Sequence, residues 1–89
     1  MGRSKAESAV LKSFGANVRR LRVQAGLTQA KLAELVDVEL RTEQKWESGE
    51  INPPLTTLVR IQAVFACKWD LLLGQSKEAR VVAHSARAN

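Results

Sequence analysis

Residues 26–49 read GLTQAKLAELVDVELRTEQKWESG, and this stretch decides the fold. Thr28 is a favourable N-cap for a short helix, because its hydroxyl can accept a backbone N–H of the first turn. The apolar stripe of that helix is formed by Leu32, Ala33 and Val36. A further helical run covers about residues 40–47, with Trp46 as its main apolar anchor. Two short helices joined by a few residues, the second rich in long polar side chains, are typical of a helix-turn-helix.

A longer helix is predicted before this motif. Ser4 and Glu7 have the spacing of a capping box, in which side chains satisfy backbone N–H groups at the helix start. Gly26 can adopt the left-handed conformation at which a helix ends. Between them, apolar residues repeat at intervals of three or four, at Val10, Phe14, Val18, Leu21 and Ala25. This spacing places them on one face, so we expect a single amphipathic helix.

Two more helical segments are predicted after the motif. The pair of prolines that begins at Pro53 forms a rigid connection, and proline is tolerated in the first turn of the next helix. The apolar face of that helix is expected to contain Leu55, Leu58, Ile61 and Phe65. A fifth, short turn covers residues 69–73 and is closed by Gly74. Strand-like alternation is missing, so the sequence predicts an all-α fold with Trp46 and Trp69 in the core.

The composition excludes several classes of protein. The 89 residues amount to one domain, and no apolar run approaches the roughly 20 residues of a membrane-spanning helix. Residues 1–12 lack the apolar core of a signal peptide. The single Cys67 excludes a disulfide framework, and the single His84 leaves little for a zinc site or a catalytic base. We therefore expect a cytoplasmic protein that is not an enzyme, with no membrane segment, metal or cofactor.

The charge is unevenly distributed along the chain. The net charge of +5 at pH 7 favours an anionic partner. Residues 1–30 and 51–89 are net basic, whereas residues 31–50 are net acidic. Any nucleic-acid function must therefore operate beside an acidic middle segment, which is also the segment that contains most of the predicted motif.

Residues 26–49 resemble the Cro/phage-repressor (Xre-like) helix-turn-helix DNA-binding family, and the similarity extends over roughly residues 14–74. The matching residues are Leu27, Thr28, Gln29, Leu32, Ala33, Val38, Trp46, Glu47, Gly49, Asn52, Pro53, Leu55, Leu58, Trp69, Asp70, Leu71 and Leu72. The resemblance implies a compact five-helix bundle of the lambda-repressor-like DNA-binding type, with the helix-turn-helix at about residues 28–47. In that family the third helix, here about residues 39–47, enters the DNA major groove.

The resemblance also divides the chain into three parts. Residues 13–74 correspond to the helix-turn-helix DNA-binding domain, and residues 1–12 form an N-terminal extension that continues into the first helix. Residues 75–89 form a basic, weakly ordered tail. The tail has a thin helical stripe, made of Ala79, Val82, Ala83 and Ala86. Because alanine buries little area, we expect a frayed helix there.

Base recognition is expected from the outer face of the third helix. The residues on that face are Leu40, Arg41, Thr42, Gln44 and Lys45. Arg41 can contact guanine O6 and N7, Gln44 suits adenine or a phosphate, and Lys45 suits guanine or a phosphate. Leu40 and the methyl group of Thr42 suit a thymine methyl. The alternative for each residue is an ordinary solvated helix surface.

Contacts to the DNA backbone are expected from three residues, Thr28, Gln29 and Ser48. The start of the second helix exposes backbone N–H groups that favour a phosphate, and Gln29 can add a side-chain donor there. Ser48 lies just after the third helix. For Gln29 the alternative is an ordinary exposed helix residue.

Three acidic residues depart from the family pattern. Asp37 stands in the turn where the family commonly has glycine, and Glu39 at the third helix's cap, where it has Ser or Thr. Both fit locally but repel phosphate. Glu43 replaces an apolar residue that faces the core, so it needs a partner or a route to solvent. The resemblance also implies a structural ion pair between Arg22 and Glu47.

The sequence therefore predicts a sequence-specific DNA-binding transcriptional regulator, which binds double-stranded DNA as a homodimer on a two-fold-related operator. The alternative is an antitoxin-like or other protein-interaction module on the same fold, in which the acidic surface of residues 31–50 meets a protein partner. A salt titration separates the two, because phosphate contacts make DNA affinity fall steeply with salt.

Overall fold

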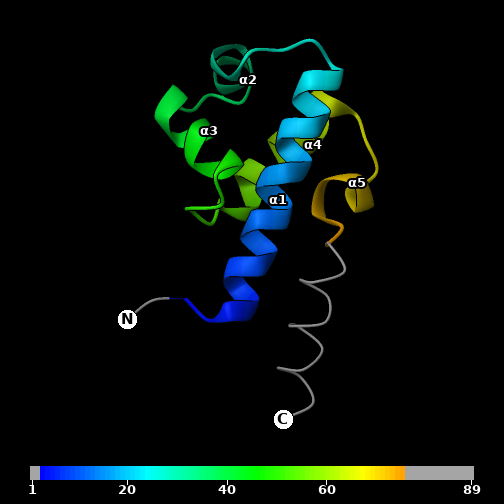
Figure 1. Cartoon of the computed structure of the whole chain (residues 1–89). Helices are drawn as coiled ribbons and strands as arrows, with labels where there is room; N and C mark the ends of the chain where they lie inside the picture. Colours follow the sequence, from blue (N-terminus) through cyan, green and yellow to red (C-terminus); the bar gives the residue numbers. More distant parts are fainter. Residues whose placement is uncertain (1–2, 76–89) are drawn as a thin grey trace.

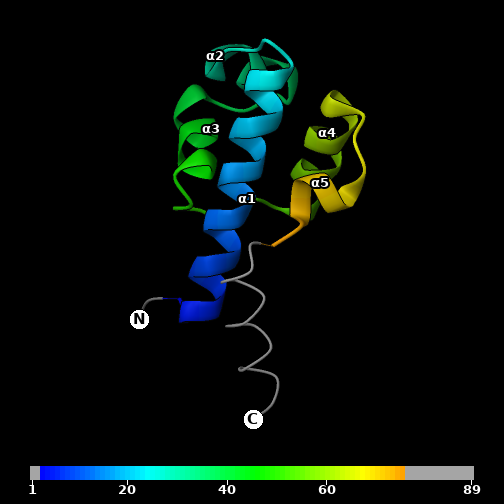
Figure 2. The ribbon, with the colours of Figure 1, turned by 45° about the vertical axis from the view of Figure 1, so that its right-hand side comes forward.

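In the computed structural model, which describes residues 3–75, the chain folds into five α-helices. They are α1 (Lys5–Gln24), α2 (Gln29–Leu35), α3 (Leu40–Glu47), α4 (Leu55–Phe65) and α5 (Trp69–Leu73). The long α1 runs through the molecule, with α2 and α3 on one side and α4 and α5 on the other (Figure 1, Figure 2). No strand occurs within residues 3–75, and the prediction of an all-α, five-helix fold is confirmed.

Local hydrogen bonds and turn residues determine where the first helices begin and end. Ser4 Oγ accepts a backbone N–H of the first turn of α1 at 3.1 Å, and Thr28 Oγ1 accepts that of Lys31 at 3.0 Å. Gly26, just beyond α1, has φ 72°, the left-handed conformation expected there. Asp37 has φ 59° in the turn between α2 and α3, a conformation that its short polar side chain tolerates. The turn that positions α3 is thus specified by its own residues.

The core contains apolar side chains from every helix. Its buried members are Phe14, Val18, Leu21, Leu32, Val36, Trp46, Ile61 and Leu72. Trp46 is 1% exposed, as the sequence predicts. The free Cys67 and Phe65 are partly buried and pack against this cluster. At the end of the predicted apolar face of α1, however, Ala25 is exposed, because it caps the helix rather than continuing it.

Two residues expected in the core are exposed. Trp69 is 41% exposed, because the short α5 buries only one side chain completely, that of Leu72. Leu55 is 73% exposed, because α4 faces the core with Thr57 and Ile61, one helical turn apart. Since Leu55 precedes Thr57 by two residues, it lies on the opposite side of the helix. The predicted core positions of Trp69 and Leu55 are therefore wrong.

Helices α1 and α3 approach each other closely at Gly15. A Cβ atom built on Gly15 would lie 2.3 Å from the backbone oxygen of Trp46 and 2.8 Å from that of Glu47. Both obstacles are backbone atoms at the end of α3, so they cannot move aside as a flexible side chain would. The absence of a side chain at position 15 therefore determines how closely α3 packs on α1, a requirement that the local sequence pattern does not reveal.

We expect Gly15→Ala to destabilise the protein by about 1–3 kcal/mol, the usual effect of overpacking. In an isolated helix the same change would stabilise by about 1 kcal/mol, because alanine is the better helix former. The sign of the change in the free energy of unfolding, measured by urea denaturation, therefore shows whether the contact with α3 or the helix preference of alanine dominates. A gain in stability would mean that α1 and α3 can separate at no cost.

The predicted division of the chain extends beyond the described residues. Helix α1 begins at Lys5, so it includes part of the predicted extension of residues 1–12. Of the predicted tail, residues 76–89, with the alanine stripe and His84, lie outside the described residues. None of the helices in the described part of the chain is long and apolar enough to cross a membrane.

Candidate functional site

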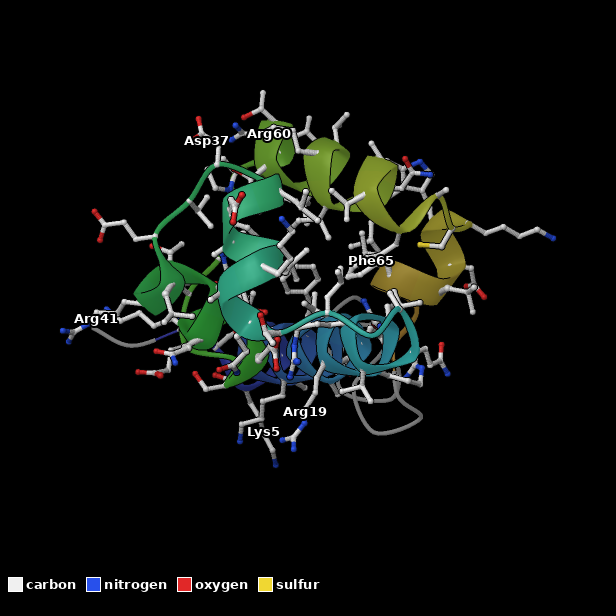
Figure 3. The ribbon with its side chains drawn as sticks, turned by 90° about the horizontal axis from the view of Figure 1, so that it is seen from above. Lys5, Arg19, Asp37, Arg41, Arg60 and Phe65 are labelled. Atoms are coloured by element: carbon white, nitrogen blue, oxygen red, sulfur yellow. The ribbon has the colours of Figure 1, made fainter. Side chains whose placement is uncertain are left out.

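Four of the five side chains expected to read bases lie on the outer face of α3, whereas Thr42, one helical turn before the buried Trp46, lies at the edge of that face. Leu40 is 42% exposed, Arg41 and Gln44 are exposed, and Thr42 and Lys45 are half-buried. Arg41 points away from the body of the molecule (Figure 3). A shallow hollow of about 380 Å³ on this face is lined by Arg41, Gln44, Lys45, Ser48 and Glu50. The buried residues of α3 lie on its other face, so the helix separates a core side from a polar side.

A network of hydrogen bonds connects this face to the core. The guanidinium of Arg22 donates to the carboxylate of Glu47 at two points, at 2.6 Å and 3.1 Å, and to the carbonyl of Leu27 at 2.9 Å. The ion pair expected between Arg22 and Glu47 is therefore present. Gln29 Nε2 donates to Glu47 Oε1 at 3.3 Å, and Gln44 Nε2 donates to Gln29 Oε1 at 3.3 Å. The Arg22–Glu47 ion pair thus connects α1 to α3, and the hydrogen bonds of Gln29 add α2 and extend the network to Gln44 on the exposed surface of α3.

Glu43 is completely buried beside this ion pair. Its Oε2 lies 3.9 Å from Arg22 Nε, and neither carboxylate oxygen accepts a hydrogen bond within residues 3–75. Burial, and after it the neighbouring Glu47, raise the pKa of Glu43 to about 8, although Arg22 opposes the shift. Glu43 therefore holds a proton at neutral pH, and in that form it can donate to Glu47. The first-helix arginine is the partner that sequence alone did not identify.

Glu47 has the opposite protonation behaviour. Burial disfavours its charged form, but the hydrogen bonds from Arg22 and Gln29, together with the neighbouring carboxyl group of Glu43, outweigh this and lower the pKa of Glu47. The Glu47 carboxylate in turn raises the pKa of Arg22, mainly through their hydrogen bond. Glu47 and Arg22 are therefore both charged at neutral pH, and Glu43 is the neutral member of the group.

Like Gln29, the other two residues expected at the DNA backbone have intramolecular partners. Thr28 is exposed, and its side chain accepts the N-capping hydrogen bond of α2 from the backbone N–H of Lys31. The hydroxyl of Ser48 lies 2.6 Å from a Glu50 carboxylate oxygen and 3.1 Å from the Lys45 carbonyl, and its one hydrogen serves either acceptor. Thr28 and Ser48 therefore lie at the surface as expected, next to the start of α2 and the end of α3.

Arg3 was not recognised as part of this region from the sequence. Its guanidinium donates to the carbonyls of Gly49, at 3.2 Å, and Glu50, which fastens the segment before α1 to the turn after α3. Arg3 and Gly49 are 46 positions apart along the chain, so no local sequence pattern indicates this contact.

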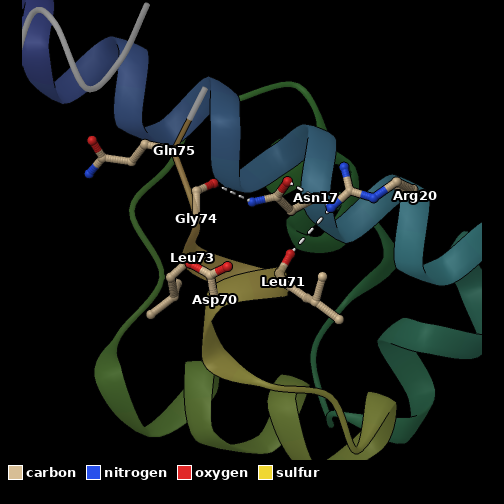
Figure 4. Close-up of a pocket in the computed structure, with 7 residues that line it drawn as sticks. All are labelled: Asn17, Arg20, Asp70, Leu71, Leu73, Gly74 and Gln75. Atoms are coloured by element: carbon tan, nitrogen blue, oxygen red, sulfur yellow. Dashed lines mark hydrogen bonds between the residues drawn. The ribbon is translucent and has the colours of Figure 1, made fainter. Parts of the chain in front are cut away.

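A second hollow, of about 450 Å³, lies between α1 and α5 (Figure 4). Asn17 Nδ2 donates to the carbonyls of Leu72 and Gly74, at 2.9 Å and 2.8 Å, and Arg20 donates to Asn17 and Leu71. These bonds satisfy carbonyls at the end of α5, which is a structural task. Among residues 3–75 no group of three or more His, Cys, Asp or Glu side chains could hold a metal ion.

Comparisons with known proteins agree with this geometry. The family model HTH_3, described as helix-turn-helix, matches residues 18–72. Among solved structures, the crystal structure of the clp gene regulator ClgR from Corynebacterium glutamicum is similar, with a TM-score of 0.71. The similarity covers 89% of this chain and 85% of that chain at 20% sequence identity, so it concerns the fold alone. A comparison with curated protein sequences gives no match.

Proposed function

The chain belongs to the helix-turn-helix family, and on this basis we propose that it is a sequence-specific DNA-binding transcriptional regulator whose helix α3 enters the major groove. The protein of similar structure, ClgR, is a gene regulator, which supports the same role. A DNA-binding regulator acts in the compartment that contains the DNA, and the cytoplasmic location expected from the sequence is consistent with this role. We propose no enzymatic activity and no cofactor for this protein.

The observation that carries the proposal is the two-sided construction of α3. Its core side is fixed by Trp46 and by the Arg22–Glu47 ion pair, so its orientation is defined. Its outer side presents the hydrogen-bonding side chains that read base edges. The proposed base-reading residues are Leu40, Arg41, Thr42, Gln44 and Lys45.

The DNA backbone would be held at both ends of the motif. We assign these contacts to Thr28, Gln29 and Ser48, which position the protein on the duplex without selecting a base. We further propose that two copies bind a two-fold-related operator, because symmetric pairing supplies the affinity and the site length that one small domain lacks.

Selection of bound sequences from random duplex DNA tests the proposed function directly. We expect one recurrent, two-fold-related sequence, bound with an affinity that falls steeply as the salt concentration rises. Recovery of random sequences would count against sequence-specific binding. A partner protein that binds, together with no DNA binding at any salt concentration, would favour the interaction module instead. The exposed Asp37 and Glu39 beside α3 are the observation that supports that second candidate.

Arg41 is the strongest candidate for direct base readout. Its exposed guanidinium makes no ion pair within residues 3–75, so it is available for a bidentate contact with guanine. Arg41→Ala should weaken binding to the preferred site by about 1–3 kcal/mol and relax the preference at one base pair. Affinity measurements on duplexes varied at that position check this. Equal weakening on every sequence would assign Arg41 to the phosphates.

A further inference from the structure

Two glutamine side chains connect the buried Glu47 to the outer face of α3. Gln29 Nε2 lies 3.3 Å from Glu47 Oε1, and Gln29 Oε1 lies 3.3 Å from Gln44 Nε2. Gln29 is half-buried and Gln44 is exposed, so the chain of contacts runs from the protein interior to solvent. The three residues come from α2 and α3, the two helices of the motif.

The carboxylate determines the direction of both amides. An ionised carboxylate only accepts hydrogen bonds, so Gln29 must present its NH₂ group to Glu47 and its carbonyl to Gln44. Gln44 must then present its own NH₂ group to that carbonyl. Reversal of either amide would place two acceptors or two donors against each other. The low pKa of Glu47 keeps it ionised at neutral pH.

This direction leaves a defined set of groups for DNA. One N–H of Gln44 is used by Gln29, so the carbonyl Oε1 and the second N–H remain available. Adenine offers a donor at N6 and an acceptor at N7 in the major groove, which match an amide carbonyl and N–H together. A phosphate only accepts, so it would use the N–H and leave the carbonyl oxygen unpaired.

We propose that Glu47, acting through Gln29, orients the Gln44 amide to read adenine, which makes Gln44 a specificity-determining residue and Gln29 its positioning residue. This inference rests on the proposed function, because it concerns the same face of α3. It adds a role in base preference to the backbone contact assigned to Gln29, whose second N–H is still available for a phosphate.

The test uses the full chain and four duplexes that differ only in the base pair facing Gln44. The variants are Gln44→Met, Gln29→Met and the double variant, with Gln24→Met on the exposed end of α1 as the matched control. Gln44→Met should reduce the preference for adenine by roughly fivefold to a hundredfold, the usual range for a bidentate contact. Gln29→Met should remove a large part of the same preference, and the double variant should lose little more than Gln44→Met alone.

Several outcomes would overturn the inference. Gln29→Met could weaken all four duplexes equally and leave the preference for adenine intact, in which case Gln29 contacts only a phosphate. Gln44→Met could leave all preferences unchanged, in which case Gln44 reads no base. Two controls support the inference if Gln29→Met loses its preference for adenine. Gln24→Met should keep all base preferences, and Gln29→Met should keep its melting temperature, so that the loss is due to the orientation of Gln44. If the unmodified protein prefers no sequence at all, the proposed function fails, and this inference fails with it.

Discussion

Glu47→Gln should lower the free energy of unfolding by about 3–5 kcal/mol, because the change leaves the charge of Arg22 without its partner. The side chains of Arg22 and Glu47 are only 13% and 6% exposed, so water cannot replace the lost carboxylate. Small domains have total stabilities of only about 5–15 kcal/mol, so this single change should remove a large share. The effect should be visible as a fall of many degrees in melting temperature.

Thermal melts of Glu47→Gln, Arg22→Met and the double variant check this expectation. Each single variant leaves one buried charge unpaired, whereas the double variant leaves none, so the two losses should not add. The exposed pair of Lys31 and Glu34, at 3.5 Å, is a matched control, and Lys31→Met should cost less than about 1 kcal/mol. Losses of that small size in the buried pair, adding in the double variant, would contradict the structural role.

The positions of α2 and α3 could be predicted because the residues that form them lie next to one another in the sequence. The Thr28 cap, the left-handed Asp37 and the inward Trp46 all act within a few residues, where periodicity and capping rules apply. The exposed positions of Leu55 and Trp69 could not be predicted in this way. An apolar residue in a short helix fits either face, and packing against distant helices decides which one is buried.

Contacts between distant residues account for what the sequence did not reveal about the candidate site. Gly15 looks like an unfavourable residue within a helix until α3 is placed against it. The partner of Glu43 could not be identified because Arg22 and Glu43 are on different helices. The direction of the Gln29 amide likewise depends on Glu47, which is eighteen positions further along the chain.

Glu43→Val should raise the melting temperature, with the fold and DNA binding retained. Glu43 is completely buried and its oxygens have no hydrogen-bond donor in residues 3–75, so it is a poor match to its surroundings. Valine has a similar volume, and burial of a neutral polar group whose hydrogen bonds are not made costs roughly 1–3 kcal/mol, which the apolar side chain avoids. Arg22 would not be left unpaired, because it retains Glu47 as its partner. Each kcal/mol corresponds to about 4–8 °C in a domain of this size.

The gain should grow with pH, for a reason that follows from the raised pKa of Glu43. Below pH 4.5 the carboxyl group is protonated in the folded and the unfolded chain alike. Between pH 4.5 and about 8 the unfolded chain ionises while the folded chain keeps its proton, so the stability of the unmodified protein decreases as pH rises. Glu47, whose pKa is lowered, loses its contribution only at acidic pH. The difference in stability between Glu43→Val and the unmodified protein should therefore increase up to about pH 8.

Urea denaturation of the unmodified protein, Glu43→Val and Glu43→Gln at several pH values measures this difference. Glutamine keeps the length of the side chain but cannot titrate, so it should remove the pH dependence without the full gain of valine. Titrating groups that do not interact with Glu43 cancel in the comparison, and Glu47, which does interact with it, titrates only at acidic pH. A loss of stability with valine at neutral pH would show that protonated Glu43 makes a hydrogen bond to Glu47 that the fold needs. Lost DNA binding with intact stability would instead show that α3 is rotated, with residue 43 at the interface, and would favour the protein-interaction module.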